Sequence, residues 1–303
     1  MSLRKKIIIY FLLIAGSFIF IFPLWWMFIV SLSDSQDAIA VASGYKSFEL
    51  FPDDPQWKNY PEAIKGLSAV KEMPDGIKGG RHNVAGGDWS GFLDSLSNSI
   101  VVTFFTILGT ILSSSLVGYG FARLRYRGKS TLFFIMLATM MVPGQVTMIP
   151  LFLLFKSLGW VNTFYPLIIP SFFGSAYFIF LFRQYYGQIG EDIFNAATLD
   201  GASHIEIWWH ILIPISKPVV AITAIFTFLG TWNDFMTPLI YLNSRENYTI
   251  AVALNNFRGM YWGADDIHLM MAASLVTMIP CVLLFVFAQK YFIEGLNVGG
   301  MKG

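Results

Sequence analysis

The sequence predicts an all-α membrane protein with six transmembrane helices. Of its 303 residues, 55% are hydrophobic and 13% are charged, which is about half the charged fraction of ordinary soluble proteins. Six apolar runs each reach the roughly 20 residues that a helix needs to cross the hydrocarbon core. No run alternates with period two, as a membrane barrel would require. Helices are therefore expected, because each satisfies its backbone hydrogen bonds within one segment.

The expected spans are residues 7–30, 100–122, 131–155, 161–182, 219–242 and 269–288. The first run follows Arg4, Lys5 and Lys6, and small residues at 40–42 resemble a signal-peptide cleavage site. A signal core is only about 7–15 residues long and ends beside its cleavage site. The first run is longer and ends well before residue 40, so an uncleaved span is expected.

Basic residues set the expected orientation, since positively charged loops stay in the cytoplasm. They occur at the N-terminus and at Arg123, Arg125, Arg127 and Lys129. Both termini, loop 123–130 and segment 187–216 are expected to be cytoplasmic, with 31–99 and 243–268 outside. The chain then divides into an N-terminal tail and first span (1–30), an extracytoplasmic loop (31–99) and a five-helix core (100–303). Prolines and glycines in 31–99 favour turns and short helices. Residues 69–89 fit either a solvated loop or a docking element.

A polar segment lies between the fourth and fifth apolar runs. It reads Asn195-Ala196-Ala197-Thr198-Leu199-Asp200-Gly201, then nine residues, then Ile211-Leu212-Ile213-Pro214. This spacing resembles the signature E-A-A-x3-G-x9-I-x-L-P of permease subunits of ATP-binding-cassette (ABC) importers, and the end of the chain, residues 299–303, extends the resemblance. The most similar group is the smaller subunit of maltose-type sugar permeases. The resemblance implies the type I ABC importer permease fold.

In that family the segment is a coupling helix in contact with a cytoplasmic ATPase, so we call residues 187–216 the coupling segment. The residues that the resemblance assigns to ATPase coupling are Asn195, Ala196, Ala197, Asp200, Gly201, Ile211, Pro214, Gly300 and Lys302. Asn195 stands where the family usually has glutamate, and Ile213 where it has leucine. We expect Glu191 or Asp192 to supply the missing negative charge.

Local chemistry predicts a helix, a bend and a second helix in this segment. Glu191 and Asp192 suit a helix N-terminus, and Gly201 can supply the left-handed turn that ends the helix. The second helix is expected over 202–213, with Pro214 starting the return into the membrane. Trp208 and Trp209 would equally suit an interfacial connector without a partner, and composition alone leaves that alternative open.

The resemblance implies a transport subunit and not an enzyme. Its partners would be a second homologous permease, two cytoplasmic ATPases, an extracytoplasmic solute-binding protein and the lipid bilayer of the bacterial inner membrane, with no nucleic acid. The substrate would be a sugar or oligosaccharide. No cofactor is expected in this chain, with ATP and Mg bound by the ATPases. Gly128-Lys129-Ser130 resembles the end of a phosphate-binding loop, but Arg123 occupies the position of its first glycine.

No catalytic or metal site is expected. Cys281 is the one cysteine, which excludes an internal disulfide. His204 and His210 are six residues apart, a separation that does not place them on one helical face as the i, i+4 spacing of a metal pair does.

Polar residues within or beside the apolar runs are candidates for the translocation path. They are Gln145, Asn233 and Asp234. An aspartate inside the hydrocarbon costs roughly 2.5–3.5 kcal/mol, so it must face protein or water. Asp234 could instead cap a helix broken before Pro238, and Gln145 could mark only a kink. A competing class is a self-sufficient ion-coupled carrier or intramembrane enzyme that uses Asp234.

The outer connection 243–268 carries amide and aromatic side chains. Asn256, Phe257, Arg258 and Tyr261 are candidate contacts for the external binding protein, because the related permease inserts a loop from this place into its binding protein. Anchoring of the aromatic residues at the membrane interface is the alternative.

Overall fold

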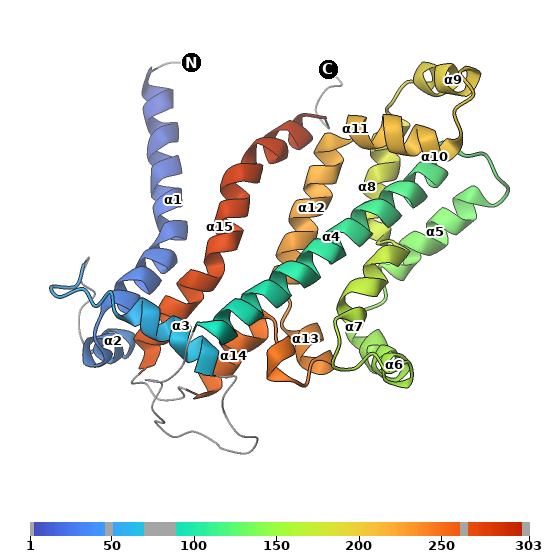
Figure 1. The fold of residues 1–303 in the computed structure, drawn as a ribbon. Coiled ribbons are helices and arrows are strands. Elements are labelled where there is room, and N and C mark those ends of the chain that lie inside the picture. Colours follow the sequence, from blue (N-terminus) through green and yellow to red (C-terminus); the bar gives the residue numbers. More distant parts are fainter. Residues whose placement is uncertain (1–2, 46–50, 70–88, 261–265, 299–303) are drawn as a thin grey trace. The chain divides into compact units, whose positions relative to one another are not determined.

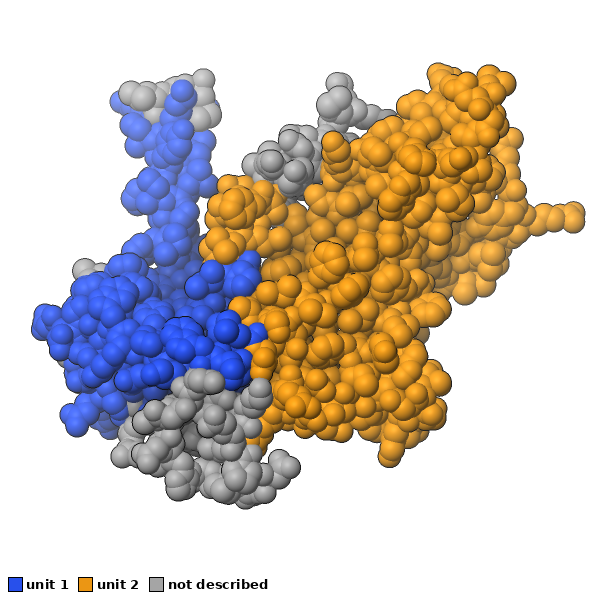
Figure 2. All heavy atoms as spheres, viewed as in Figure 1, with its two compact units in different colours: residues 1–93, 253–280 blue, residues 94–252, 281–303 orange. Residues whose placement is uncertain are grey.

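A computed structural model describes residues 3–45, 51–69, 89–260 and 266–298. The described residues form helices and connecting turns, and none of them lies in a strand. The chain divides into two compact units (Figure 2). Unit 1 comprises residues 1–93 and 253–280, and unit 2 comprises residues 94–252 and 281–303.

Four helical segments among the described residues are long and apolar enough to cross a membrane by themselves. They are Arg4–Leu32, Ser90–Arg123, Tyr165–Gly187 and Ile267–Gln289. Two helix pairs bent by 94° and 81° qualify together. The count therefore rises to six if each pair forms one span, as predicted from the six apolar runs.

Unit 1 contains α1 (Leu3–Leu32), α2 (Ser35–Ala42) and α3 (Asn59–Ala69), with parts of α14 and α15. The end of α1 is tied to α3 by Asn59, whose buried amide donates to the Ser31 and Ser33 carbonyls at 2.8 and 2.9 Å. Asp34 caps α2 by accepting from the Asp37 backbone N–H. These short helices agree with the turns and short helices expected of 31–99; the question left open for 69–89 falls almost wholly outside the described residues.

The second span, α4 (Ser90–Arg123), begins ten residues before the apolar run that predicted it. Its glycines at 109 and 118 approach the fourth span, Tyr165–Gly187, closely, as small residues at a packed interface between membrane helices do. A Cβ added at Gly109 would clash with Ser171 Oγ, and one at Gly118 would lie 2.6 Å from Phe182 Cβ. Both glycines therefore set how closely these helices approach.

The predicted third span is broken. It consists of α5 (Lys129–Thr139) and α6 (Gly144–Ser157), which meet at 94°. Residues 140–143 form the break, and Pro143 is in extended conformation directly before α6. A kink beside Gln145 was one of the two expected alternatives. The bend is much sharper, so 131–155 is not one continuous helix.

The fourth span comprises α7 (Tyr165–Ile168), a 3₁₀ turn at Ile169–Phe173 and α8 (Ala176–Gly187). Gly174 has a φ of +87°, a conformation that L side chains rarely adopt. The break is held against α4 because the Ser175 backbone N–H donates to Ser114 Oγ at 3.2 Å.

The coupling segment contains α9 (Glu191–Leu199), α10 (His204–Glu206), a π-helical turn at Ile207–Leu212 and α11 (Ile213–Ile215). In unit 2 these helices lie at the same end as the C-terminus of α4, whereas α6 and α13 lie at the opposite end (Figure 1). The chain bends by 81° before α12 (Lys217–Trp232). Pro214 was expected to begin the return to the membrane; it lies within α11, and the bend falls at Ser216, just before Lys217-Pro218.

The fifth span ends earlier than predicted, at Trp232, and a separate short helix, α13 (Met236–Tyr241), follows. After the 3₁₀ turn Arg245–Asn247, the expected outer loop contains the helix α14 (Ile250–Met260). The last helix, α15 (Ile267–Val298), continues ten residues beyond the predicted span.

Candidate functional site

The coupling segment folds by local signals that the sequence carries. α9 has Glu191 and Asp192 in its first turn, and Gly201 follows its end with φ +81°. Ser203 and Glu206 form a capping box that starts the second helical part. Hydrogen bonds from the backbone and side chain of Ser203 hold the pKa of the exposed Glu206 carboxyl below its usual range. The predicted helix, bend and helix are therefore present.

The inner face of the segment packs on the ends of α4 and α8. Ala197, Ile207, Trp208 and Leu212 belong to one buried cluster, which also contains Tyr119, Phe182, Tyr186 and Val219. Trp208 is 8% exposed, and its indole N–H donates to Ser115 Oγ of α4 at 3.1 Å. Trp208 is thus a core residue and not a membrane-interface anchor, whereas Trp209, which the connector alternative also named, is 49% exposed.

Tyr119 joins α4 to both helical parts of the segment. Its ring stacks on Phe194 of α9, with centroids 6.5 Å apart and planes 14° from parallel. Its hydroxyl lies 3.0 Å from Nδ1 of His204, at the start of α10. A movement of the coupling segment would therefore be transmitted directly to α4 through these contacts.

Arg123 and Lys129 connect the ends of neighbouring spans beside this contact. Arg123 joins the end of α4 to the end of α8, and Lys129 joins the start of α5 to the end of α4. The Arg123 guanidinium donates to the carbonyls of Tyr186 and Ile189 at the end of α8, and it lies 4.2 Å from the centroid of the Phe194 ring. Lys129 Nζ donates to the Ala122 and Leu124 carbonyls at the end of α4. Cations are favourable at helix C-termini. Both residues were predicted only as topology signals, and their structural role was missed.

The outer face of the segment carries large apolar side chains in solvent. Leu199 is 88% exposed, and Ile193, Ile205 and Trp209 are 42%, 58% and 49% exposed. They lie on α9, on α10 and on the π-helical turn that follows it, outside α12. Grouped exposed apolar residues typically mark a surface that contacts another protein or a membrane.

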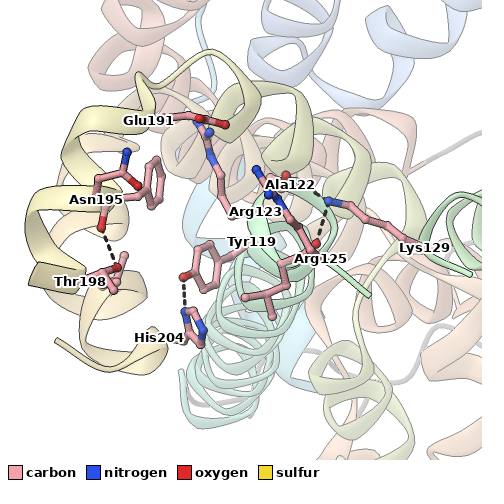
Figure 3. Close-up of a pocket in the computed structure, with 12 residues that line it drawn as sticks. Tyr119, Ala122, Arg123, Arg125, Lys129, Glu191, Asn195, Thr198 and His204 are labelled. Carbon is pink, nitrogen blue, oxygen red and sulfur yellow. Dashed lines mark hydrogen bonds between the residues drawn. The ribbon is translucent and has the colours of Figure 1, made fainter. Parts of the chain in front are cut away.

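A cavity of about 420 Å³ lies between α9 and the junction of α4 with α5 (Figure 3). Its walls are aromatic and polar, and three of its residues are cationic. The lining consists of Tyr119, Ala122, Arg123, Leu124, Arg125, Lys129, Glu191, Phe194, Asn195, Thr198, His204 and Ile207.

The structure separates the predicted coupling residues into two sets. Asn195, Ala196, Asp200, Gly201 and Pro214 are exposed. Ala197 is 7% exposed in the buried cluster, and Ile211 packs against that cluster. These two side chains help hold the segment on its own chain, and Ile211 remains half-buried. Leu199 and Ile205 are the exposed residues that motif matching missed. The predictions for Gly300 and Lys302 lie outside the described residues.

At the opposite end of unit 2, Asp234 has a local hydrogen bond. Its Oδ1 accepts from the Thr237 backbone N–H at 3.1 Å, which caps the first turn of α13. Asn233 is the C-terminal cap of α12 and donates to the Leu229 carbonyl. Capping, which the sequence left open as an alternative, thus explains how these polar groups are accommodated.

Asp234 also lines a second cavity of about 280 Å³. Hydroxyl groups dominate its polar lining, with Ser99, Thr103, Thr106, Thr231, Thr237 and Thr249 among the lining residues. Asn233 and Gln145 do not line it, and Gln145 is exposed in the first turn of α6. Of the three predicted path residues, Asp234 alone lines this cavity.

The predicted binding-protein contacts fall on and after α14. Asn256 is half-buried and Phe257 is fully buried. The Phe257 side chain therefore packs in the interior and is not available for the predicted external contact. The Arg258 side chain and Tyr261 lie outside what the structure describes. Within the described residues, no group of three or more His, Cys, Asp or Glu could hold a metal ion.

Comparison with known proteins identifies the fold. A solved bacterial ABC transporter that imports the acidic polysaccharide alginate contains a chain that matches with a TM-score of 0.72 and 21% identity, covering 96% of this chain and 99% of that one. At this identity the match shows the fold alone, and it agrees with the predicted importer permease fold.

Sequence relatives cover nearly the whole chain. The arabinooligosaccharide transport permease AraQ of Bacillus subtilis is 30% identical over 95% of this chain and 92% of its own. The melibiose/raffinose/stachyose import permease MelC of the same organism is 32% identical over 86% of both chains. Residues 114–298, which include the whole coupling segment, match the family model described as binding-protein-dependent transport system inner membrane component. The chain belongs to this family of ABC importer permeases.

Proposed function

We propose that this chain is the permease subunit of an importer that carries a sugar or short oligosaccharide into the cell. ATP hydrolysis occurs in separate cytoplasmic subunits, and an external binding protein delivers the substrate. The sugar assignment rests on relatives that carry arabinooligosaccharides or melibiose, raffinose and stachyose. The full assembly contains this chain, a second homologous permease and two ATPases. Both termini and the coupling segment face the cytoplasm.

The observation that supports ATPase coupling best is the two-faced coupling segment. Its inner face is fixed to α4 and α8 by Trp208, Tyr119 and Ala197, whereas Leu199 and Ile205 face solvent. A segment that is rigidly attached on one side and apolar on the other can bind a partner and pass its movement to the spans. Side-chain packing carries such coupling between distant sites.

Co-purification with the ATPase tests this proposal. Fully burying a leucine contributes about 1.5–3 kcal/mol, so Leu199→Glu is expected to weaken ATPase binding by at least about tenfold. Tyr126→Glu is the matched control because Tyr126 is 41% exposed in the neighbouring loop, outside the coupling segment. Equal retention of the ATPase by both variants would show that the partner docks elsewhere.

Asn195 itself does not carry the charge of the family's usual glutamate. It is exposed and, like Glu191, lines the cavity beside α9, and Glu191 and Asp192 are both exposed at the start of the same helix. We propose that these two carboxylates supply the charge at the ATPase contact. The double change Glu191→Gln and Asp192→Asn is expected to weaken ATPase binding, and unchanged binding would contradict this role.

A further inference from the structure

The cavity beside α9 carries an excess of positive charge. Arg123, Arg125 and Lys129 line it against one carboxylate, Glu191 (Figure 3). Glu191 interacts electrostatically with Arg123, but one carboxylate can balance only one of three cations. His204, also in the lining, adds no negative charge in either protonation state.

The protein neutralises these cations only in part. Lys129 and Arg123 donate to backbone carbonyls, which are dipoles without net charge. The Arg123 Nε–H is buried and has no acceptor among the described residues. Arg125 is exposed and forms no hydrogen bond within the described part of the chain. One cavity is therefore lined by hydrogen-bond donors that the described residues leave without acceptors, on Arg123 and Arg125, and by more positive than negative charge.

The position of the cavity matches the depth of lipid headgroups. The span Ser90–Arg123 ends and the helix Lys129–Thr139 begins at its wall. A general tendency of basic loops to stay inside the cell would place arginines in this loop, but it does not require them to share a cavity. Arg127, in the same loop, is exposed and lies outside the lining.

We infer that this cavity binds the phosphate group of an anionic phosphate ester, with Arg125, Lys129 and Arg123 as its cationic side chains. Arginine and lysine are the usual partners of phosphate, and basic pockets between membrane helices bind anionic headgroups. The ester has two possible sources at this depth, the headgroup of an anionic phospholipid or a soluble phosphate ester. Because the cavity separates α9 from the α4–α5 junction, its occupant would brace the coupling segment against these spans.

Binding to the purified full-length chain in neutral detergent tests the site without the ATPase, so the result is independent of the proposed docking. The probes are dioctanoyl phosphatidylglycerol, dioctanoyl phosphatidylcholine and glycerol 3-phosphate. Native mass spectrometry or calorimetric titration measures the affinity of each. Arg125→Gln removes a lining charge, Arg127→Gln is the control from the same loop, and Asn195→Asp adds a carboxylate to the lining with almost no change in size.

Phosphatidylglycerol is expected to bind more tightly than phosphatidylcholine. Arg125→Gln is expected to weaken that binding about fivefold, the factor associated with one basic side chain near an anionic headgroup. Asn195→Asp is expected to weaken it as well, and Arg127→Gln to leave it unchanged. If glycerol 3-phosphate binds with the same dependence on Arg125, the site accepts soluble esters; if only the lipid binds, the headgroup is the source. Equal losses from both arginine variants, or no loss from Arg125→Gln, would overturn the inference.

Discussion

Gly118 provides the sharpest test of how α4 packs against α8. A Cβ at this position would lie 2.6 Å from Phe182 Cβ and 3.2 Å from the Arg183 backbone nitrogen. Ordinary carbon contacts are about 3.5–4.0 Å, so Gly118→Ala must push the two helices apart by about 1 Å. Overpacking of this kind typically costs about 1–3 kcal/mol.

Gly120 is a matched control on the same helix. A Cβ there meets nothing within 4 Å. Replacing glycine by alanine inside a helix stabilises it by about 0.5–1 kcal/mol, and this gain applies to both positions. The difference between Gly118→Ala and Gly120→Ala therefore isolates the overpacking energy, and we expect Gly118→Ala to be less stable by about 1–3 kcal/mol.

The assay is reversible unfolding of each variant in mixed micelles, with the free energy of unfolding taken from the transition. ATP-driven uptake by the reconstituted assembly is measured in parallel, since Phe182 belongs to the cluster beneath the coupling segment. Equal stability of the two variants, or a more stable Gly118→Ala, would refute the close approach of α4 and α8.

Three further changes test the contacts around the coupling segment and α13. Trp208→Phe removes the hydrogen bond to Ser115 and is expected to destabilise the protein by about 1–3 kcal/mol, measured by unfolding; Trp208→Phe with Ser115→Ala should recover part of this loss, and no recovery would contradict the bond. Gly201→Ala places a side chain at φ +81° and should cost about 1–2 kcal/mol, whereas Gly187→Ala, in the last turn of α8 with nothing within 4 Å of the added Cβ, should not. Asp234→Asn keeps a capping oxygen and should preserve stability, whereas Asp234→Ala should lose about 1 kcal/mol; equal losses would argue against capping.

Much of the fold was predictable because membrane-length apolar runs have few structural solutions. The six runs, the bend at Gly201 and the helix start at Glu191 follow from composition and local backbone preferences. The breaks were harder to predict. Residues 140–142, Met-Met-Val, continue the apolar character of α5, so hydropathy does not reveal the 94° bend beside them.

The site was predictable in position but not in detail. Motif spacing located the coupling segment, yet it cannot say which side chains face inward. Ala197 and Trp208 pack on α4 because of tertiary contacts with Tyr119 and Ser115, which are far away in sequence. Arg123 was predicted from charge alone as a topology signal, and its hydrogen bonds to the end of α8 depend on how two spans meet.

The central claim is that the coupling segment transmits work from separate ATPases to a permease that has no energy source of its own. Sugar uptake into proteoliposomes tests it directly, with the chain reconstituted either alone or with its partner permease, ATPases and binding protein. We predict uptake only in the full assembly with ATP, and its loss with Leu199→Glu. Uptake by the chain alone, driven by an ion gradient, would contradict the claim.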